Sequence, residues 1–434
     1  MQVSKVFSRA YAAWSGCGNL RSRRERCKRF TYGDQWGDAV PDGHGGYIRE
    51  GQQIVDQGKR PYTNNLIRQL VKGVVGRYRT IAREQGYYGG CVGAIARRNA
   101  LEELDARALE EFLISGCAIQ RVSDERRWNG NGVWVDNVDP RRFFVNAFTD
   151  PRGWDIDLVG MLHDMSLPEL INRFSGGDGV RAAELKRIYS GVDAEPSIAS
   201  AAGAVSFHVS ADPERCRVVE VWSFDSRPSA DGSSNAEFCW HCRNFAPDGT
   251  LLAEYDSPYA HGSHPFVIKF YPLTDGEVHS FVEDVLDQQK FINRLIVMLD
   301  HITACSAKGV LLYPLDQLPE GITLDQVVDV WAQADGLIPV TGRGAVMPQQ
   351  VSGSGASAGA YQLLDMQMKL FEHVSGVGSA LMGRSQNARG ADMLASEVQN
   401  ATTALADLFE SFRAFTRLRN EKALRVRSAV RTDN

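Results

Sequence analysis

The apolar positions in the last third of the chain recur with helical spacing. From Asp275 to Ala307 they lie three or four residues apart, with one interruption at Gln289. Thr274 and Glu277 have the spacing of a capping box, in which each side chain binds a backbone amide at the start of a helix. The pattern therefore predicts a long helix that begins near Asp275.

A small module of mixed strand and helix signals follows between residues 309 and 350. Thr323 and Gln326 repeat the capping-box spacing, and Val327 and Trp331 follow one helical turn apart. These two apolar side chains are expected to form the core of the module.

Two further helices are predicted after this module. The first covers Tyr361–Val374, and the glycine-rich segment Ser375–Gly390 separates it from the second, which runs from Ala391 to near Ser428. The last helix ends with seven basic residues, which fit a rim facing DNA or a solvated helix end favoured by the dipole: Arg413, Arg417, Arg419, Lys422, Arg425, Arg427 and Arg431.

The first two thirds of the chain mix helix and strand patterns. Residues 1–80 are predicted to be helical and basic, and the apolar face of Asn65–Ile81 contains Leu66, Ile67, Leu70, Val74 and Tyr78. A helix at Glu102–Ile114 leads into strands separated by turns without crossover helices, which indicates antiparallel pairing and an α+β fold. The strand signals are Ala118–Val122, Val133–Val135, Arg217–Phe224, Phe238–Asn244, Leu251–Tyr255 and Pro265–Phe270.

Two other segments of this region have local signals. Ser166 and Glu169 form a further capping-box pattern at the start of a short helix. Gly176–Ser206 is rich in Gly, Ala and Ser, and a weakly ordered loop is expected there.

The composition fits a folded protein that does not wrap nucleic acid. Hydrophobic residues make up 43% of the chain, enough for a sizeable core. A formal net charge of −5 argues against nucleic-acid binding over the whole surface but permits DNA to slide past, because an acidic wall holds a polyanion weakly. The eight cysteines lack a secreted framework's spacing and are expected to be reduced. No apolar run spans a bilayer, so a soluble protein without a membrane partner is expected.

Few residues have the spacing of a catalytic or cofactor site. The sequence contains no P-loop pattern, which argues against an NTPase. Cys239-Trp-His-Cys242 has the inner spacing of a zinc site, but it lacks a second Cys/His pair and also alternates as a strand does. The basic run at Arg21–Arg29 fits a solvated helix face, a subunit contact or a phosphate contact. No catalytic residue, metal or cofactor is therefore expected.

Several segments in this order resemble the portal proteins of tailed bacteriophages. A polar loop and a long amphipathic helix follow the last of these segments, and the resemblance extends over most of the chain. The segments are Phe30–Trp36, Pro61–Asn65, Leu113–Ile119, Val138–Phe143 and Glu372–Gly383.

The resemblance implies a portal fold in six parts. They are a wing at residues 1–272, stem helices at 273–308 and 353–375, a clip at 309–352, a tunnel loop at 376–390 and a helical crown at 391–434. It also implies packing residues in the stem and polar residues lining a DNA channel in the tunnel loop. The stem residues are Phe281, Val285, Ile292, Leu295 and Leu299, and the loop residues are Arg384, Gln386, Asn387 and Arg389.

The function that this resemblance implies is structural. Portals form closed rings, usually of twelve subunits, at one vertex of a virion, after assembly in the host cytoplasm. Double-stranded DNA passes through the ring, and the terminase, the capsid or scaffolding protein and the tail adaptors dock on it. The alternatives are a nuclease or NTPase of the packaging machinery, or another ring-forming protein of the virion.

Overall fold

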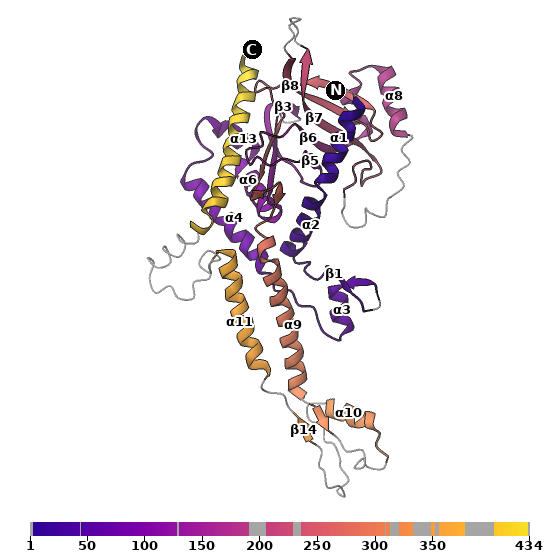
Figure 1. The fold of residues 1–434 in the computed structure, drawn as a ribbon, viewed down its shortest axis with the longest axis vertical. Coiled ribbons are helices and arrows are strands. Elements are labelled where there is room, and N and C mark those ends of the chain that lie inside the picture. The colour runs from indigo at the N-terminus through magenta and orange to yellow at the C-terminus, as the bar shows by residue number, and fades with distance from the viewer. Residues whose placement is uncertain are drawn as a thin grey trace. The chain divides into compact units, whose positions relative to one another are not determined.

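The described residues of the computed structural model form two compact units (Figure 1). The described ranges are 3–43, 45–127, 130–190, 205–228, 236–308, 310–312, 321–332, 349–351, 356–377 and 403–432. Unit 1 consists of Met1–Tyr32, Ile67–Asp284 and Gly376–Asn434, and unit 2 of Gly33–Leu66 and Val285–Ser375. Gly33–Leu66 lies within the predicted wing range but clusters with the second unit.

Two antiparallel sheets form the centre of unit 1. The larger has the order β5-β6-β7-β8-β9, with strands at Phe143–Val145, Leu158–Ser166, Arg215–Pro228, Ala236–Phe245 and Leu251–Asp256. The smaller has the order β10-β3-β4, with strands at Phe266–Phe270, Cys117–Arg127 and Gly130–Asn137. Every strand pair in both sheets is antiparallel, so the predicted α+β class is confirmed.

Helices and the second sheet cover the two faces of the five-stranded sheet. Helix α1 (Val3–Gly16) packs Val6, Ala10 and Trp14 against one face. The other face contributes Trp222 and Cys242 to a core shared with residues of the smaller sheet, such as Ile119, Phe266 and Phe270. Successive strand residues point to opposite faces, and because both faces are covered, β7 is buried at every position from Cys216 to Ser223.

The remaining helices of unit 1 complete its core. Helix α13 (Ala406–Thr432) packs against the smaller sheet. The Phe412 ring in α13 lies 5.1 Å from Tyr78 and 5.7 Å from Phe112, measured between ring centroids. The other helices are α2 (Gly18–Tyr32), α4 (Leu66–Glu84), α5 (Gly93–Asn99), α6 (Leu101–Ser115), α7 (Leu167–Phe174) and α8 (Gly179–Ser190). All five predicted apolar positions of α4 are buried.

Unit 2 is built around two helices that lie side by side (Figure 1). These are α9 (Leu286–Lys308) and α11 (Ala356–Ser375). Strand β13 (Val310–Leu312) pairs antiparallel with β14 (Gln349–Val351), and α10 (Leu324–Ala332) lies between them in sequence. The segment before α4 adds β1 (Ala39–Pro41), β2 (Tyr47–Arg49) and α3 (Glu50–Asp56).

The long helix begins later than predicted. Leu273–Thr274 and Glu277–Val278 form the short antiparallel strands β11 and β12, joined by Asp275 and Gly276 with φ of 53° and 80°. Asp-Gly is favoured in the two-residue hairpin turns that need positive φ at both positions. The spacing of Thr274 and Glu277 therefore reflects a hairpin, and the capping box predicted there is wrong.

Two further expectations need correction. The segment 1–80 is not helical throughout, because the β1–β2 hairpin interrupts it. In the glycine- and alanine-rich segment, residues 179–190 form α8, whose Leu185 is buried with Leu170 and Met165. The residues around Leu185 (Ala182, Ala183, Glu184, Lys186 and Arg187) favour helix, and burial of Leu185 stabilises it, whereas the glycines and serines that suggested a loop lie outside this core. Residues 191–204 lie outside the described residues.

Two of the predicted caps are confirmed. Ser166 Oγ accepts a hydrogen bond from the Glu169 amide at the start of α7. At the start of α10, the Thr323 amide donates to Gln326 Oε1 over 3.1 Å, while the Gln326 amide donates to Thr323 Oγ1 over 3.4 Å. This reciprocal pair satisfies two amides that an uncapped helix leaves without partners.

Candidate functional site

The predicted stem-packing residues are buried within the described part of the chain. Val285, Ile292, Leu295 and Leu299 are each at most 5% exposed, and Phe281 is half-buried before α9 begins. Their burial is achieved without a neighbouring subunit. They therefore stabilise the fold of the single chain, and their role as packing residues of a stem stays a prediction.

Helices α9 and α11 also expose a set of apolar side chains. Phe291 and Met298 lie seven residues apart on one face of α9, and Met366, Leu370 and Val374 lie at intervals of four along α11. All five are 40–49% exposed. Exposed apolar side chains that line up on helices are typical of a protein contact surface.

Gln289, the one interruption in the apolar pattern, binds backbone at the start of α4. Its Nε2 donates to the Asn64 carbonyl oxygen over 2.7 Å, and its Oε1 accepts from the Leu66 amide over 3.0 Å. Asn293, one turn later, accepts from the Asn64 amide over 3.0 Å and donates to Gln35. No predicted site included this cluster, although a polar residue in an apolar stripe indicates such a buried polar contact.

The predicted core of the small module is described in part. Val327 in α10 is 4% exposed, as expected of a core residue. Trp331 belongs to the same helix, but its side chain lies outside the described residues.

The four predicted channel residues also lie outside the described part of the chain. They are Arg384, Gln386, Asn387 and Arg389, and the described residues end at Val377 and resume at Thr403. Their role remains a prediction.

Two of the basic residues in the last helix are buried inside unit 1. Arg419 is 1% exposed and pairs with Asp105. Lys422 donates to the carbonyl oxygens of His264 and Phe266 over 2.6 and 2.8 Å, and burial lowers its pKa to about 7. These two side chains hold α13 against the rest of unit 1, so neither belongs to a basic rim or a solvated helix end.

The amino-terminal arginine run is also engaged within unit 1. Arg24 is buried and donates two hydrogen bonds to the Glu111 carboxylate, at 2.7 and 2.8 Å. Burial alone lowers the pKa of Arg24, but the Glu111 carboxylate outweighs it and the net shift is upward. Arg21 stacks 3.7 Å from the Trp14 ring centroid and donates to the Trp14 carbonyl oxygen. These two arginines stabilise the fold and are not solvated charges.

The strand interpretation of Cys239-Trp-His-Cys242 is confirmed. All four residues lie in β8, where Cys242 is buried in the core between the sheets. Cys239 lies three positions earlier and therefore on the opposite face. The two thiols cannot bind one zinc ion from opposite faces of a strand, so the zinc site of the Cys-x-x-Cys type is excluded.

A comparison with known families identifies a match over most of the chain. The family model described as "Phage P22-like portal protein" matches residues 88–432. No curated protein matches the chain. Among the described residues, no helix is long and apolar enough to cross a membrane.

Proposed function

The chain belongs to the P22-like phage portal protein family, and from this premise we propose that it forms a closed ring at one capsid vertex. Double-stranded DNA passes through the ring during packaging and ejection. The ring has twelve subunits, assembles in the host cytoplasm with the capsid or scaffolding protein, and carries no catalytic site or cofactor.

The exposed apolar faces of α9 and α11 carry this proposal. Five side chains on these faces are 40–49% exposed in the single chain. In a ring, each subunit contacts its two neighbours through two different surfaces. Repeating this contact gives a closed ring when the rotations between subunits add up to a full turn. Burying these faces between neighbours removes apolar surface from water, which stabilises the contact by roughly 25 cal/mol per Å² of buried apolar area.

The predicted parts of the portal receive specific roles under this proposal. The clip at 309–352 docks the terminase during packaging and the tail adaptors afterwards. The tunnel loop at 376–390 directs Arg384, Gln386, Asn387 and Arg389 toward the DNA. A few positive charges on a chain of net charge −5 hold the phosphate backbone transiently, so that DNA keeps moving.

The alternative of a packaging enzyme is less favoured. A P-loop motor cradles phosphates with a Gly-rich loop and a lysine, and this sequence contains no such pattern. The family match also points to a structural component rather than to a nuclease or NTPase.

Electron microscopy of the purified full chain, with native mass measurement of the same sample, tests the proposal. We expect closed rings whose central channel admits duplex DNA. A chain that stays monomeric at high concentration and also with its capsid or scaffolding protein present contradicts it.

A further inference from the structure

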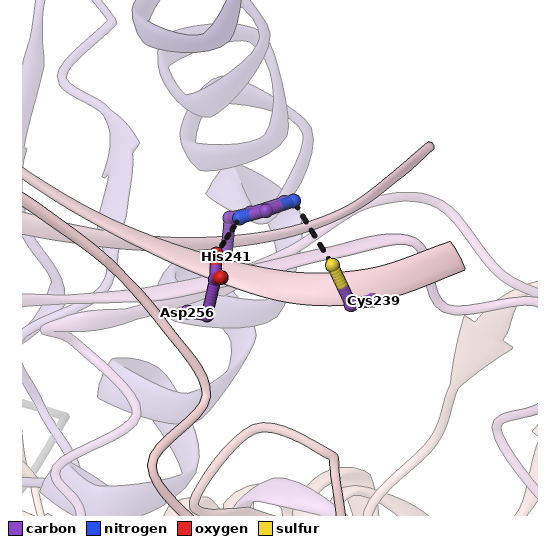
Figure 2. A group of neighbouring side chains, drawn as sticks. All are labelled: Cys239, His241 and Asp256. Atoms are coloured by element: carbon purple, nitrogen blue, oxygen red, sulfur yellow. Dashed lines mark hydrogen bonds and ion pairs between the residues drawn. The ribbon is translucent and has the colours of Figure 1, made fainter. Parts of the chain in front are cut away.

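Strand β8 extends beyond the end of its neighbour β9 and places three reactive side chains together. His241 is the cross-strand partner of Asp256, the last residue of β9. Cys239 lies two residues before His241 on β8 and so shares its face. Figure 2 shows the imidazole between the thiol and the carboxylate.

The three groups are connected through the two ring nitrogens of His241. Cys239 Sγ lies 3.1 Å from Nε2, and Asp256 Oδ1 lies 2.6 Å from Nδ1. An ionised carboxylate only accepts hydrogen bonds, so Asp256 selects the tautomer with the proton on Nδ1. The lone pair of Nε2 then faces the thiol of Cys239, and His241 can accept its proton.

The imidazole is more deeply buried than the carboxylate that it contacts, and Cys239 is half-buried. The His241 side chain is 11% exposed and the Asp256 side chain 45%. Cys239 is half-buried, in contrast to the fully buried Cys242 on the other face of the strand. A positioned base beside a thiol is the arrangement that activates a nucleophile.

This geometry favours proton transfer over metal binding. The three ligand atoms lie within 4.8 Å of one another. However, the thiol and the carboxylate face different nitrogens of His241, and one ion binds only one of these nitrogens. The three donors therefore do not converge on a point, as tetrahedral zinc ligands must.

The neighbouring charges on this face are largely paired with each other. Asp225 is the cross-strand partner of Cys239 on β7, and its carboxylate lies 3.0 Å from Arg243 Nη1. Glu254 on β9 lies 2.8 Å from Nη2 of the same arginine. His241 is therefore the group positioned to take the thiol proton.

We propose that Cys239 is an activated nucleophile for thiol–disulfide exchange with low-molecular-weight disulfides, with His241 as its base and Asp256 as the positioning residue. The thiol proton moves to His241 Nε2, and the Cys239 thiolate attacks one sulfur of the disulfide. The old S–S bond breaks as a mixed disulfide with Cys239 forms, and the leaving thiolate takes the proton from the imidazolium. The disulfide is the oxidant and releases one thiol. This inference is independent of ring formation.

Cys91 provides an internal control, because it is exposed on the same chain. The full chain is incubated with oxidised glutathione at pH 6.5 without metal, and the mixed disulfides are quantified by peptide mass spectrometry. We expect Cys239 to react about tenfold faster than Cys91, because the reacting species is the thiolate. At pH 10 an ordinary thiol is also ionised, so the advantage should disappear, and this comparison requires no variant.

Two substitutions separate the roles of the partners. His241→Asn removes the base and should bring the Cys239 rate to or below that of Cys91. Asp256→Asn replaces the carboxylate with an amide whose NH2 can donate to His241 Nδ1, so the tautomer is no longer fixed and the Cys239 rate should fall as well. The thiols of Cys117 and Cys242 are buried, and their lack of reaction in each variant reports that the fold is intact.

Three results overturn the proposal. The first is a wild-type Cys239 that reacts no faster than Cys91 at pH 6.5. The second is a His241→Asn protein that retains the wild-type ratio of rates. The third is protection of Cys239 by one equivalent of Zn²⁺ together with an ordinary rate in its absence, which identifies a metal site instead.

Discussion

Arg419 and Asp105 form a buried, bidentate ion pair although 314 positions separate them in sequence. Nη1 lies 2.9 Å from Oδ1 and Nη2 lies 3.0 Å from Oδ2, and both side chains are 1% exposed. Gln120 in β3 accepts from Arg419 and donates to Asp105. The pair links α13, α6 and the smaller sheet, so removal of one partner leaves a buried charge.

Asp105→Asn should therefore lower the free energy of unfolding by about 3–5 kcal/mol, measured by urea denaturation. The control is Arg417→Ala, which removes an exposed pair with Glu421 at 3.9 Å and should cost less than about 1 kcal/mol. Equal losses in the free energy of unfolding would contradict the prediction that the buried pair contributes more to stability than the exposed pair.

A matched pair of glycine substitutions tests the packing of the larger sheet. A Cβ at Gly160 in β6 would overlap the Glu220 carbonyl oxygen and the Phe144 ring, so Gly160→Ala should destabilise by about 1–3 kcal/mol. Gly76 is exposed in α4 with open space around it, and Gly76→Ala should stabilise by about 0.5–1 kcal/mol. Thermal unfolding of both variants measures the shifts, and shifts of the same sign would contradict the prediction.

The stability of unit 1 should decrease as the pH falls below about 6.5, the ordinary histidine pKa. Burial, with Lys422 and His261 nearby, lowers the pKa of His264 well below that value. The unfolded chain then binds a proton that the folded chain does not, which costs at most about 1.4 kcal/mol per pH unit.

His264→Asn tests this pH dependence, because its side-chain oxygen can still accept the Phe266 amide hydrogen bond. Urea denaturation between pH 7 and pH 5 should show a smaller slope for the variant. A smaller contribution should remain from His261, whose pKa burial lowers to about 4. Identical slopes in variant and wild type would rule out His264 as the source.

The proposed ring predicts that exposed apolar residues of α9 and α11 are needed for assembly. Met298→Ser combined with Leu370→Ser should prevent rings while the chain stays folded, because both side chains are already exposed. Val180→Ser in α8, at a residue 79% exposed, is the control and should assemble normally. Native mass and circular dichroism separate assembly from folding, and normal rings from the double variant would contradict the assigned surface.

The proposed tunnel loop predicts a defect in DNA passage. Arg384→Glu combined with Arg389→Glu should reduce the amount of packaged DNA while leaving rings intact, because two phosphate contacts become repulsive. Lys186→Glu combined with Arg187→Glu in α8 makes the same charge change elsewhere and should package normally. A wild-type amount of packaged DNA in the loop variant would contradict the assignment of these residues to the DNA channel.

The local elements of this protein could be predicted from its sequence because their signals lie within a few residues. The apolar stripe of α4, the cap of α10 and the strand signals of β7 and β8 each follow from residue types and spacing along the chain. The start of α9 was misplaced because Thr274 and Glu277 satisfy one short pattern, while the Asp275-Gly276 turn between them follows another.

Tertiary structure decided which polar residues have partners. Arg419 is paired with Asp105, and Gln289 binds the backbone at Asn64 and Leu66, across distances that no local pattern encodes. Cys239 and His241 meet Asp256 only because β8 pairs with β9 in one register. The sequence determined the helices, the strands and the family resemblance, because those depend on short-range periodicity. Only the folded chain determined the partners of buried charges and the Cys239–His241–Asp256 group, because they depend on which distant segments pack together.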